Sequence, residues 1–220
     1  MRLTTSRLAN AGQPGFNNPM KRTIIMAALV AGLTTTQAQE QLSRQDALKY
    51  AFAVSANLPA MLKTPIPTDP DVKRPVACRD GDYGGMVLPE AKLSAAVFAK
   101  AGKEAVAVGQ LWLLKLVPMN DGQAVPAGKL RMVEVSSEEG QATVPCCALG
   151  VCKDDKGGLE LLVFGKDKEP LLRAPLRPIT RQQENPVEMS AERKDEGGLV
   201  TLRFLGKYEA SFMVTDPELY

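Results

Sequence analysis

Short apolar runs separated by turn residues follow one another from Asp71 onward, and this rhythm is typical of an all-β domain. Alternating apolar and polar residues place the apolar side chains on one face of a strand. Three alternating runs, at 187–192, 200–204 and 208–214, predict an antiparallel meander near the C-terminus. Gly206-Lys207 lies between the last two runs and suits a two-residue type II′ turn, because glycine readily takes a positive φ.

Five further strands are predicted upstream of the meander, which brings the total to about eight. Apolar runs bounded by turn signals place them at 84–88, 105–117, 129–136, 141–151 and 159–164. A sheet of this size usually resolves its edges by forming a sandwich or a barrel. The predicted fold class is therefore mainly β: an antiparallel β-sandwich or partly open barrel of about eight strands, with an N-terminal α-helix packed against it.

One helix is predicted ahead of the strands, at residues 43–56. The Ser43 hydroxyl can cap an orphan amide, and Asp46 places an acid in the first turn. The nearly continuous apolar run at 111–117 suits a central strand buried on both faces, and we expect the helix to pack there. The alternative is a helix that binds a partner. Residues 94–101 fit a second short helix or a strand equally well.

A proline-rich connector at 63–70 separates the helix from the strands. Three prolines in these eight residues exclude a regular element with a full hydrogen-bond ladder. The predicted organisation is a signal region at 1–38, a helix with its connector at 39–70, and a β domain at 71–220. The mature chain of 182 residues, which is 220 less 38, is long enough for one domain with a sizeable core.

The first 38 residues predict an export signal of bacterial type. Two basic residues follow Met20, an apolar run occupies 23–33, and small residues lead to Ala38. The apolar run is shorter than the roughly 20 residues of a transmembrane helix. We expect translation to start at Met20 and cleavage to release a soluble chain from Gln39, without a membrane span, into the periplasm or the medium. The alternative is translation from Met1, which would give the signal an unusually long n-region.

Histidine is absent from the chain, and this restricts its chemistry. Without an imidazole, no Ser-His-Asp or Cys-His arrangement and no His-ligated zinc site can form. Loss of the signal region removes four basic residues and leaves 23 basic against 25 acidic side chains. Nucleic-acid binding requires a concentrated basic face, which this nearly neutral balance does not suggest. We therefore expect no nucleic-acid partner.

Four cysteines follow the predicted cleavage point: Cys78, Cys146, Cys147 and Cys152. Exported proteins usually meet an oxidising compartment, so these cysteines are candidates for disulfides. Cys146 and Cys147 point to opposite faces of a strand, and the favoured pair is Cys78 with one of them. The alternative is a soft-metal or redox site of Cys146, Cys147 and Cys152, but the spacing matches neither C-x-x-C nor paired zinc knuckles. We expect structural disulfides or buried thiols and no metal or other cofactor.

Asp80 and Asp82 lie in a glycine-rich segment beside Tyr83 and form the most site-like stretch of the sequence. The simpler interpretation is a turn in which the aspartates bond the local backbone. As a calcium loop the stretch is incomplete, because the distal Glu is not at the expected position. The alternative is a general acid/base pair that shares a proton.

Arg173, Arg177 and Arg181 recur at every fourth position, but Pro175 and Pro178 exclude a regular helix interior. We expect an extended edge or crossover with solvated arginines, since charged side chains and prolines protect sheet edges. The alternative is an anion-binding strip.

Two hypotheses of function remain. The first is an exported non-enzymatic domain that binds a protein or cell-envelope partner through loops or an exposed strand edge. The alternative is a secreted hydrolase, of the peptidase or glycosidase type, that uses Asp80 and Asp82 with Glu90 or a glutamate from another loop. Loss of activity in Asp80→Asn would separate them. The oligomeric state is left open.

Overall fold

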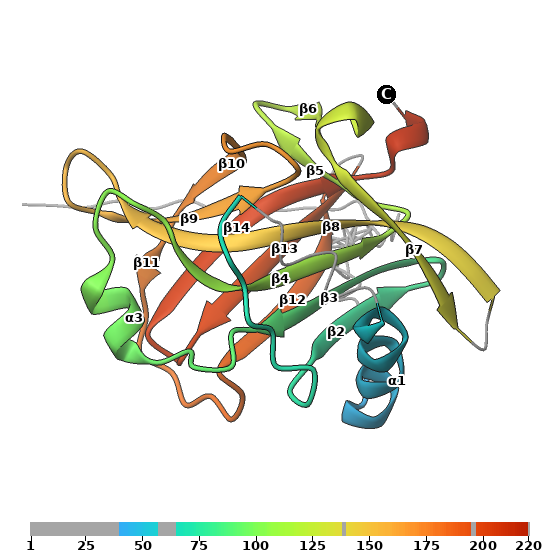
Figure 1. The fold of residues 1–220 in the computed structure, drawn as a ribbon, viewed down its shortest axis with the longest axis horizontal. Helices are drawn as coiled ribbons and strands as arrows, with labels where there is room; N and C mark the ends of the chain where they lie inside the picture. Colours follow the sequence, from blue (N-terminus) through green and yellow to red (C-terminus); the bar gives the residue numbers. More distant parts are fainter. Residues whose placement is uncertain (1–39, 57–64, 138–139, 195–196, 220) are drawn as a thin grey trace, which may run out of the picture. The chain divides into compact units, whose positions relative to one another are not determined.

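The computed structural model describes residues 40–56, 65–137, 140–194 and 197–219, all within one compact unit. These residues form 14 strands in two antiparallel sheets, together with a few short helices (Figure 1). The predicted mainly-β class is confirmed, with more strands than the predicted eight. The predicted export signal lies outside the described residues. So do Asn57-Leu58-Pro59, which the sequence predicts to end the helix, and residues 138–139 and 195–196, which belong to two predicted turns.

The first sheet has the strand order β1-β2-β3-β4-β8-β9-β10, and β7 also pairs with β8. Because β8 is 14 residues long, its first half pairs with β7 and its second half with β9 along the same edge. The strands are β1 Glu40–Gln41, β2 Val76–Asp80, β3 Tyr83–Pro89, β4 Val106–Leu114, β7 Arg131–Ser137, β8 Gly140–Lys153, β9 Leu159–Phe164 and β10 Pro170–Pro175.

The second sheet has the order β12-β13-β14-β5-β6, and β11 also pairs with β14. The strands are β5 Val117–Asn120, β6 Gln123–Ala124, β11 Arg177–Pro178, β12 Val187–Lys194, β13 Gly197–Phe204 and β14 Tyr208–Thr215. The predicted C-terminal meander is confirmed as β12-β13-β14. Its last turn differs from the prediction, because Leu205 (φ 56°) and Gly206 (φ 64°) take the left-handed conformation instead of Gly206-Lys207. A Cβ at Gly206 would lie 2.1 Å from the Arg181 carbonyl oxygen.

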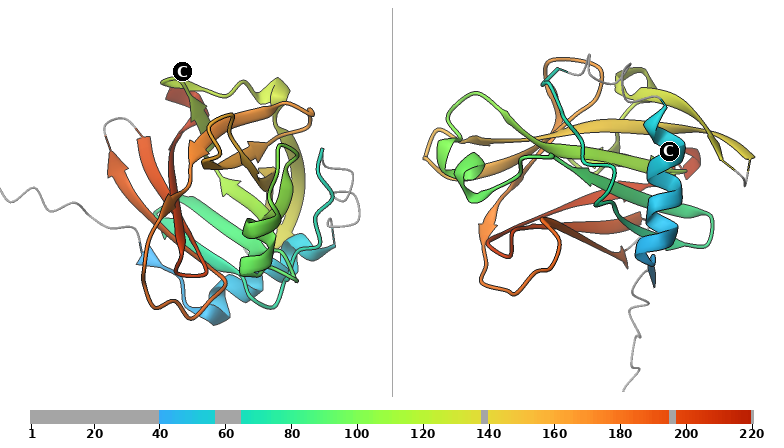
Figure 2. Two further views of the ribbon diagram at one scale, coloured as in Figure 1. Left: turned by 90° about the vertical axis from the view of Figure 1, so that its left-hand side faces the viewer. Right: turned by 60° about the horizontal axis from the view of Figure 1, so that its bottom comes forward.

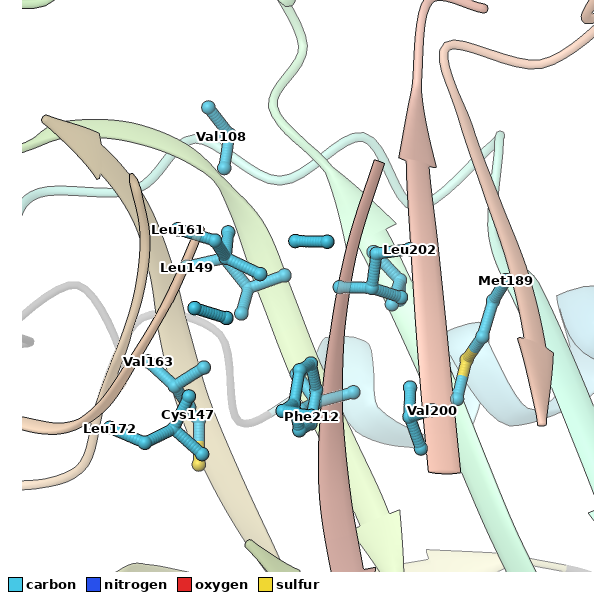
Figure 3. Packing of buried hydrophobic residues seen from close by; sticks show 14 of the residues in the cluster. Val108, Cys147, Leu149, Leu161, Val163, Leu172, Met189, Val200, Leu202 and Phe212 are labelled. Atoms are coloured by element: carbon cyan, nitrogen blue, oxygen red, sulfur yellow. The ribbon is translucent and has the colours of Figure 1, made fainter. Parts of the chain in front are cut away.

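The main core lies between the two sheets. Leu149, Leu161 and Val163 of the first sheet face Leu202 and Phe212 of the second (Figure 3). Each of these side chains belongs to one continuous buried cluster, and all five are at most 6% exposed. The alternation in the sequence therefore marks the faces that the two sheets turn toward each other.

Helix α1 (Arg44–Ser55) covers the outer face of the first sheet, where it contacts β2 and β7 (Figure 1). It runs crosswise to the strands in the right-hand view of Figure 2. The Ser43 hydroxyl accepts a hydrogen bond from the Asp46 amide at 3.2 Å, as the predicted cap requires. Ala51 and Val54 are buried against Trp112 of β4. The prediction that the helix packs against the β domain is confirmed, but its backbone contacts are with β2 and β7, and it shares with β4 only the apolar cluster around Trp112.

The connector is fastened to β3 and β4 through polar contacts. Both oxygens of the Glu90 carboxylate accept from the Asp69 amide, at 2.8 and 2.9 Å. Gln110 is fully buried; its Nε2 donates to the Thr68 hydroxyl at 2.8 Å, and its Oε1 accepts from Trp112 Nε1 at 3.2 Å. This chain of hydrogen bonds satisfies polar groups that would otherwise be costly to bury.

The predicted strand at 105–117 is divided between the two sheets. Lys115 takes a positive φ of 54°, and there the chain leaves β4 of the first sheet for β5 of the second. Residues 94–101, which fitted two interpretations, contain the helix α3 (Ala95–Lys100). Phe98 of α3 stacks on Tyr208 with ring centroids 4.8 Å apart.

Single-turn 3₁₀ helices complete the described elements, at Ala127–Lys129 and Pro217–Leu219. In the described parts of the chain, every helix is too short or too polar to cross a membrane.

Candidate functional site

Asp80 and Asp82 belong to the tight turn that joins β2 to β3. Asp80 pairs with Tyr83 as the last rung of the ladder, and Gly81 between the aspartates has a φ of 59°. Glycine takes this conformation without strain, which favours a glycine at this point. The local structure is therefore a hairpin turn, as in the simpler interpretation, but the two aspartate side chains bind Arg193 and Lys115 instead of the local backbone.

The two carboxylates bind different cations. Asp80 Oδ2 accepts from Arg193 Nε at 2.7 Å, and Asp82 Oδ2 accepts from Lys115 Nζ at 2.9 Å. The hydrogen bond from Lys115 lowers the pKa of Asp82 below its ordinary value. A pair that shares a proton needs two carboxylates in contact with each other. Glu90 follows the opposite end of β3, so the structure does not gather the three acids into one site.

Tyr83 adds a third contact, since its hydroxyl donates to Asp216 Oδ2 at 2.6 Å. This hydrogen bond raises the pKa of Tyr83 and lowers that of Asp216. The turn is thus connected to β12, to the β4–β5 turn and to the residue after β14. These contacts join the two sheets at one end, and they give the charged residues a structural role.

The cysteines form none of the expected disulfides, because all four are free and buried. The favoured pairing of Cys78 with Cys146 or Cys147 is wrong: Cys78 lies on β2 and the other two on β8, with β3 and β4 between them. Three inter-strand steps span about 14 Å, whereas bridged Cα atoms lie within about 7 Å. The Cys78 thiol donates to the Met189 carbonyl oxygen at 3.4 Å instead.

Cys146, Cys147 and Cys152 point into three separate apolar clusters. The prediction that the two adjacent cysteines face opposite sides of the sheet is confirmed. Burial raises the pKa of Cys78 to about 11 and that of Cys147 to about 12, so both stay protonated at neutral pH. Over the described ranges, no three Cys, Asp or Glu side chains lie close enough together to hold a metal ion.

Protein-family models, curated proteins and solved structures give no match to this chain. The function is therefore argued from the geometry of the molecule alone.

Within the described part of the chain, β7 has an edge that no other strand pairs with. This strand pairs with β8 along one edge, and none of the described strands pairs with its other edge. Two residues separate Ser137 from its partner Gly140, and in such a hairpin this pair exchanges backbone hydrogen bonds. By alternation, Met132, Glu134 and Ser136 direct their N–H and C=O groups to the edge that faces away from β8.

Two further observations support this assignment. Pro145 has no N–H group and lies opposite Met132, as expected for a position that does not bond β7. Met132, Glu134 and Ser136 are all exposed. Among the described residues, Met132 is one of two large apolar side chains with more than a third of their surface exposed, at 44%. The described edge therefore offers both backbone groups and an apolar side chain.

Most of the other described edges are short, interrupted or covered. β1 and β6 have two residues each, and β10 begins and ends with proline and has a register shift between Pro170 and Leu172. β12 lies against β2, where the Cys78 thiol reaches the Met189 carbonyl. Such features protect strand edges from pairing with other chains. The expectation of an extended segment around Arg173 is confirmed, since this residue lies on the edge strand β10.

The apolar run at 129–136 predicts a strand, but it does not indicate that one edge of this strand is unpaired by the other described strands. The absence of proline from β7 was the available signal, because the edge strand β10 carries prolines.

Proposed function

We propose that this protein is an exported, non-enzymatic binding domain that recognises a partner protein at the open edge of β7. The observation that carries the proposal is the edge itself, a regular seven-residue strand without a proline or a register shift. The predicted signal region supports export to the periplasm or the cell exterior.

Recognition would occur by strand addition. An extended segment of the partner would pair with the backbone groups of Met132, Glu134 and Ser136, and main-chain hydrogen bonds would supply the affinity. Side chains of the added strand would lie beside Met132 and Val133 on the two faces of the hairpin, which would supply the specificity. In Figure 1 the β7–β8 hairpin projects beyond α1.

The test is photo-crosslinking in an exporting host. A photoreactive phenylalanine analogue at position 132 should crosslink to a specific protein, and the added substitution Glu134→Pro should abolish the product. Proline removes the outward N–H of residue 134 without removing a hydrogen bond to β8, so the hairpin should still fold. Circular dichroism and a thermal midpoint would check the fold of each variant.

Glu134→Gln is the matched control, because it alters the side chain and keeps the backbone donor; its crosslinked product should persist. The proposal fails if the product survives Glu134→Pro, or if the same product forms with the analogue at position 201, on the second sheet.

A further inference from the structure

A hollow of about 220 Å³ lies on the outer face of the first sheet, between α1 and the β7–β8 hairpin. Its walls come from α1, β2, β3, β4, β7 and β8. Trp112 and Met86 line one side, Val54 of the helix lies across from them, and Val135 and Val144 belong to the hairpin. These side chains pack in one apolar cluster, so the hollow has apolar walls from three directions.

Three local features create the hollow: a notch between β4 and β8, a small residue of α1, and a glycine on β3. The ladder between β4 and β8 ends at the pair of Trp112 with Cys146. Beyond this pair, β4 stops at Leu114, whereas β8 extends back to its first residue, Gly140. A notch therefore opens between the two strands. The helix covers this region partly with the small residue Ala53, which does not fill it.

Gly84 adds space to the floor of the hollow, because it carries no side chain. It lies on β3 in the same cross-strand row as Arg79 and Leu114. A Cβ built at Gly84 would have only ordinary contacts, the nearest being the Cys78 carbonyl oxygen at 3.5 Å and Leu114 Cβ at 3.7 Å. A side chain could therefore occupy this position without steric strain.

Arg79 supplies a polar end. Its Nη1 donates to the Tyr50 hydroxyl at 2.9 Å and its Nε to the Gly81 carbonyl oxygen at 2.8 Å, and both Arg79 and Tyr50 line the hollow. Arg79 and Trp112 are two strands and two residues apart on the same face, which corresponds to about 12 Å between their Cα atoms. The hollow thus has a cationic end and an aromatic end.

We infer that this hollow binds a small amphiphile with an acidic head at Arg79 and an apolar body that extends over Gly84 to Trp112. An apolar cavity of about 150 Å³ holds benzene, so the present volume suits an apolar body of about eight carbon atoms. A guanidinium binds a carboxylate through charge-assisted hydrogen bonds, and this chemistry favours a medium-chain carboxylate over an uncharged or cationic chain. The site involves no backbone group of the β7 edge.

Trp112 makes the inference directly testable, because it is the single tryptophan of the chain. The probe is 8-bromooctanoate, whose terminal bromine quenches tryptophan fluorescence on contact. We expect saturable quenching, with 8-bromooctanol and 8-bromooctylammonium weaker by about tenfold or more, since one charge-assisted hydrogen bond is worth about that factor.

Two variants test the two ends of the site. Gly84→Val fills the floor with a residue suited to a strand and should abolish saturable quenching. Gly128→Val is its matched control, because a Cβ at Gly128 meets nothing within 4 Å and this residue does not line the hollow; quenching should persist. Arg79→Gln should reduce the affinity for the carboxylate about tenfold, to that of the alcohol.

Absence of saturable quenching by the carboxylate in the folded wild-type protein would overturn the inference. So would unchanged binding in Gly84→Val, or equal binding of the ammonium compound. The β7 crosslinking experiment does not depend on these results, so failure of either proposal can be recognised separately.

Discussion

Glu90 shows how a single side chain makes the fold sensitive to pH. Its half-buried carboxylate holds the Asp69 amide and fixes the connector to the end of β3. Burial raises the pKa of this carboxyl above its ordinary value of 4.5, and the charge of Asp69 acts in the same direction. The native state therefore binds this proton more tightly than the unfolded chain does.

The substitution Glu90→Gln should reveal this linkage. A raised native pKa means that the stability of the wild type falls as pH rises from about 4.5 through the native pKa. The variant lacks this titration. Its free energy of unfolding minus that of the wild type should therefore be larger at pH 7 than at pH 4, which means that the variant is relatively more stable at pH 7. Urea denaturation at both pH values measures the difference.

The raised pKa of Glu90 would be contradicted if the stability difference between Glu90→Gln and the wild type were the same at both pH values or larger at pH 4. Glu192→Gln is the control for the loss of one carboxylate, because Glu192 is exposed on β12.

At the scale of elements, two irregular backbone positions mark the two ends of β4: a bulge near its start and a residue with positive φ just after its end. The register between β4 and β8 shifts between Ala107 and Gly109, which marks a β-bulge. Gly109 has a φ of 155°, and a Cβ there would lie 2.5 Å from the backbone oxygen of Leu88. Directly after β4, Lys115 takes a positive φ, and there the chain passes from the first sheet to β5 of the second sheet. Glycine at the bulge permits the close approach of β3.

Gly109→Ala should therefore destabilise the protein by about 2 kcal/mol or more, because the neighbouring atom is backbone and cannot move aside alone. Gly102→Ala is the matched control, since a Cβ at Gly102 meets nothing within 4 Å. Chemical denaturation of both variants measures the effect. Equal stability of the two variants would show that β4 and β3 can separate without cost.

At the scale of the whole molecule, four thiols in three apolar clusters distinguish this fold from a disulfide-stabilised exported domain. The sandwich core and the layer beneath α1 bury apolar surface, which stabilises a fold without covalent cross-links. The raised pKa values of Cys78 and Cys147 also slow their oxidation, because the thiolate is the reactive form.

Protein purified from an exporting host without reductant should contain four titratable thiols per chain in denaturant and react slowly with thiol reagents when folded. The intact mass should correspond to a chain that begins at Gln39. Two or fewer thiols in denaturant would show that disulfides form after all, and a retained N-terminal segment would contradict the predicted cleavage. A peptide map would assign any bridge found.

Local patterns in the sequence predicted several of the elements. Alternation with period two predicted the meander at 187–214, and Ser43 with Asp46 predicted the start of α1, because both signals depend on residues that are close in the chain. The same alternation placed Cys146 and Cys147 on opposite faces of their strand.

Only the tertiary structure decided which strands lie at edges and which residues meet across the sheets. The open edge of β7, the distance between Cys78 and Cys147, and the hollow beside Gly84 all depend on pairings between segments far apart in the chain. Asp80 and Asp82 show the same limit: their spacing in the sequence suggested a joint site, and the cations that they bind come from β12 and the β4–β5 turn. Local periodicity fixes the face of a strand, and long-range packing fixes its neighbours.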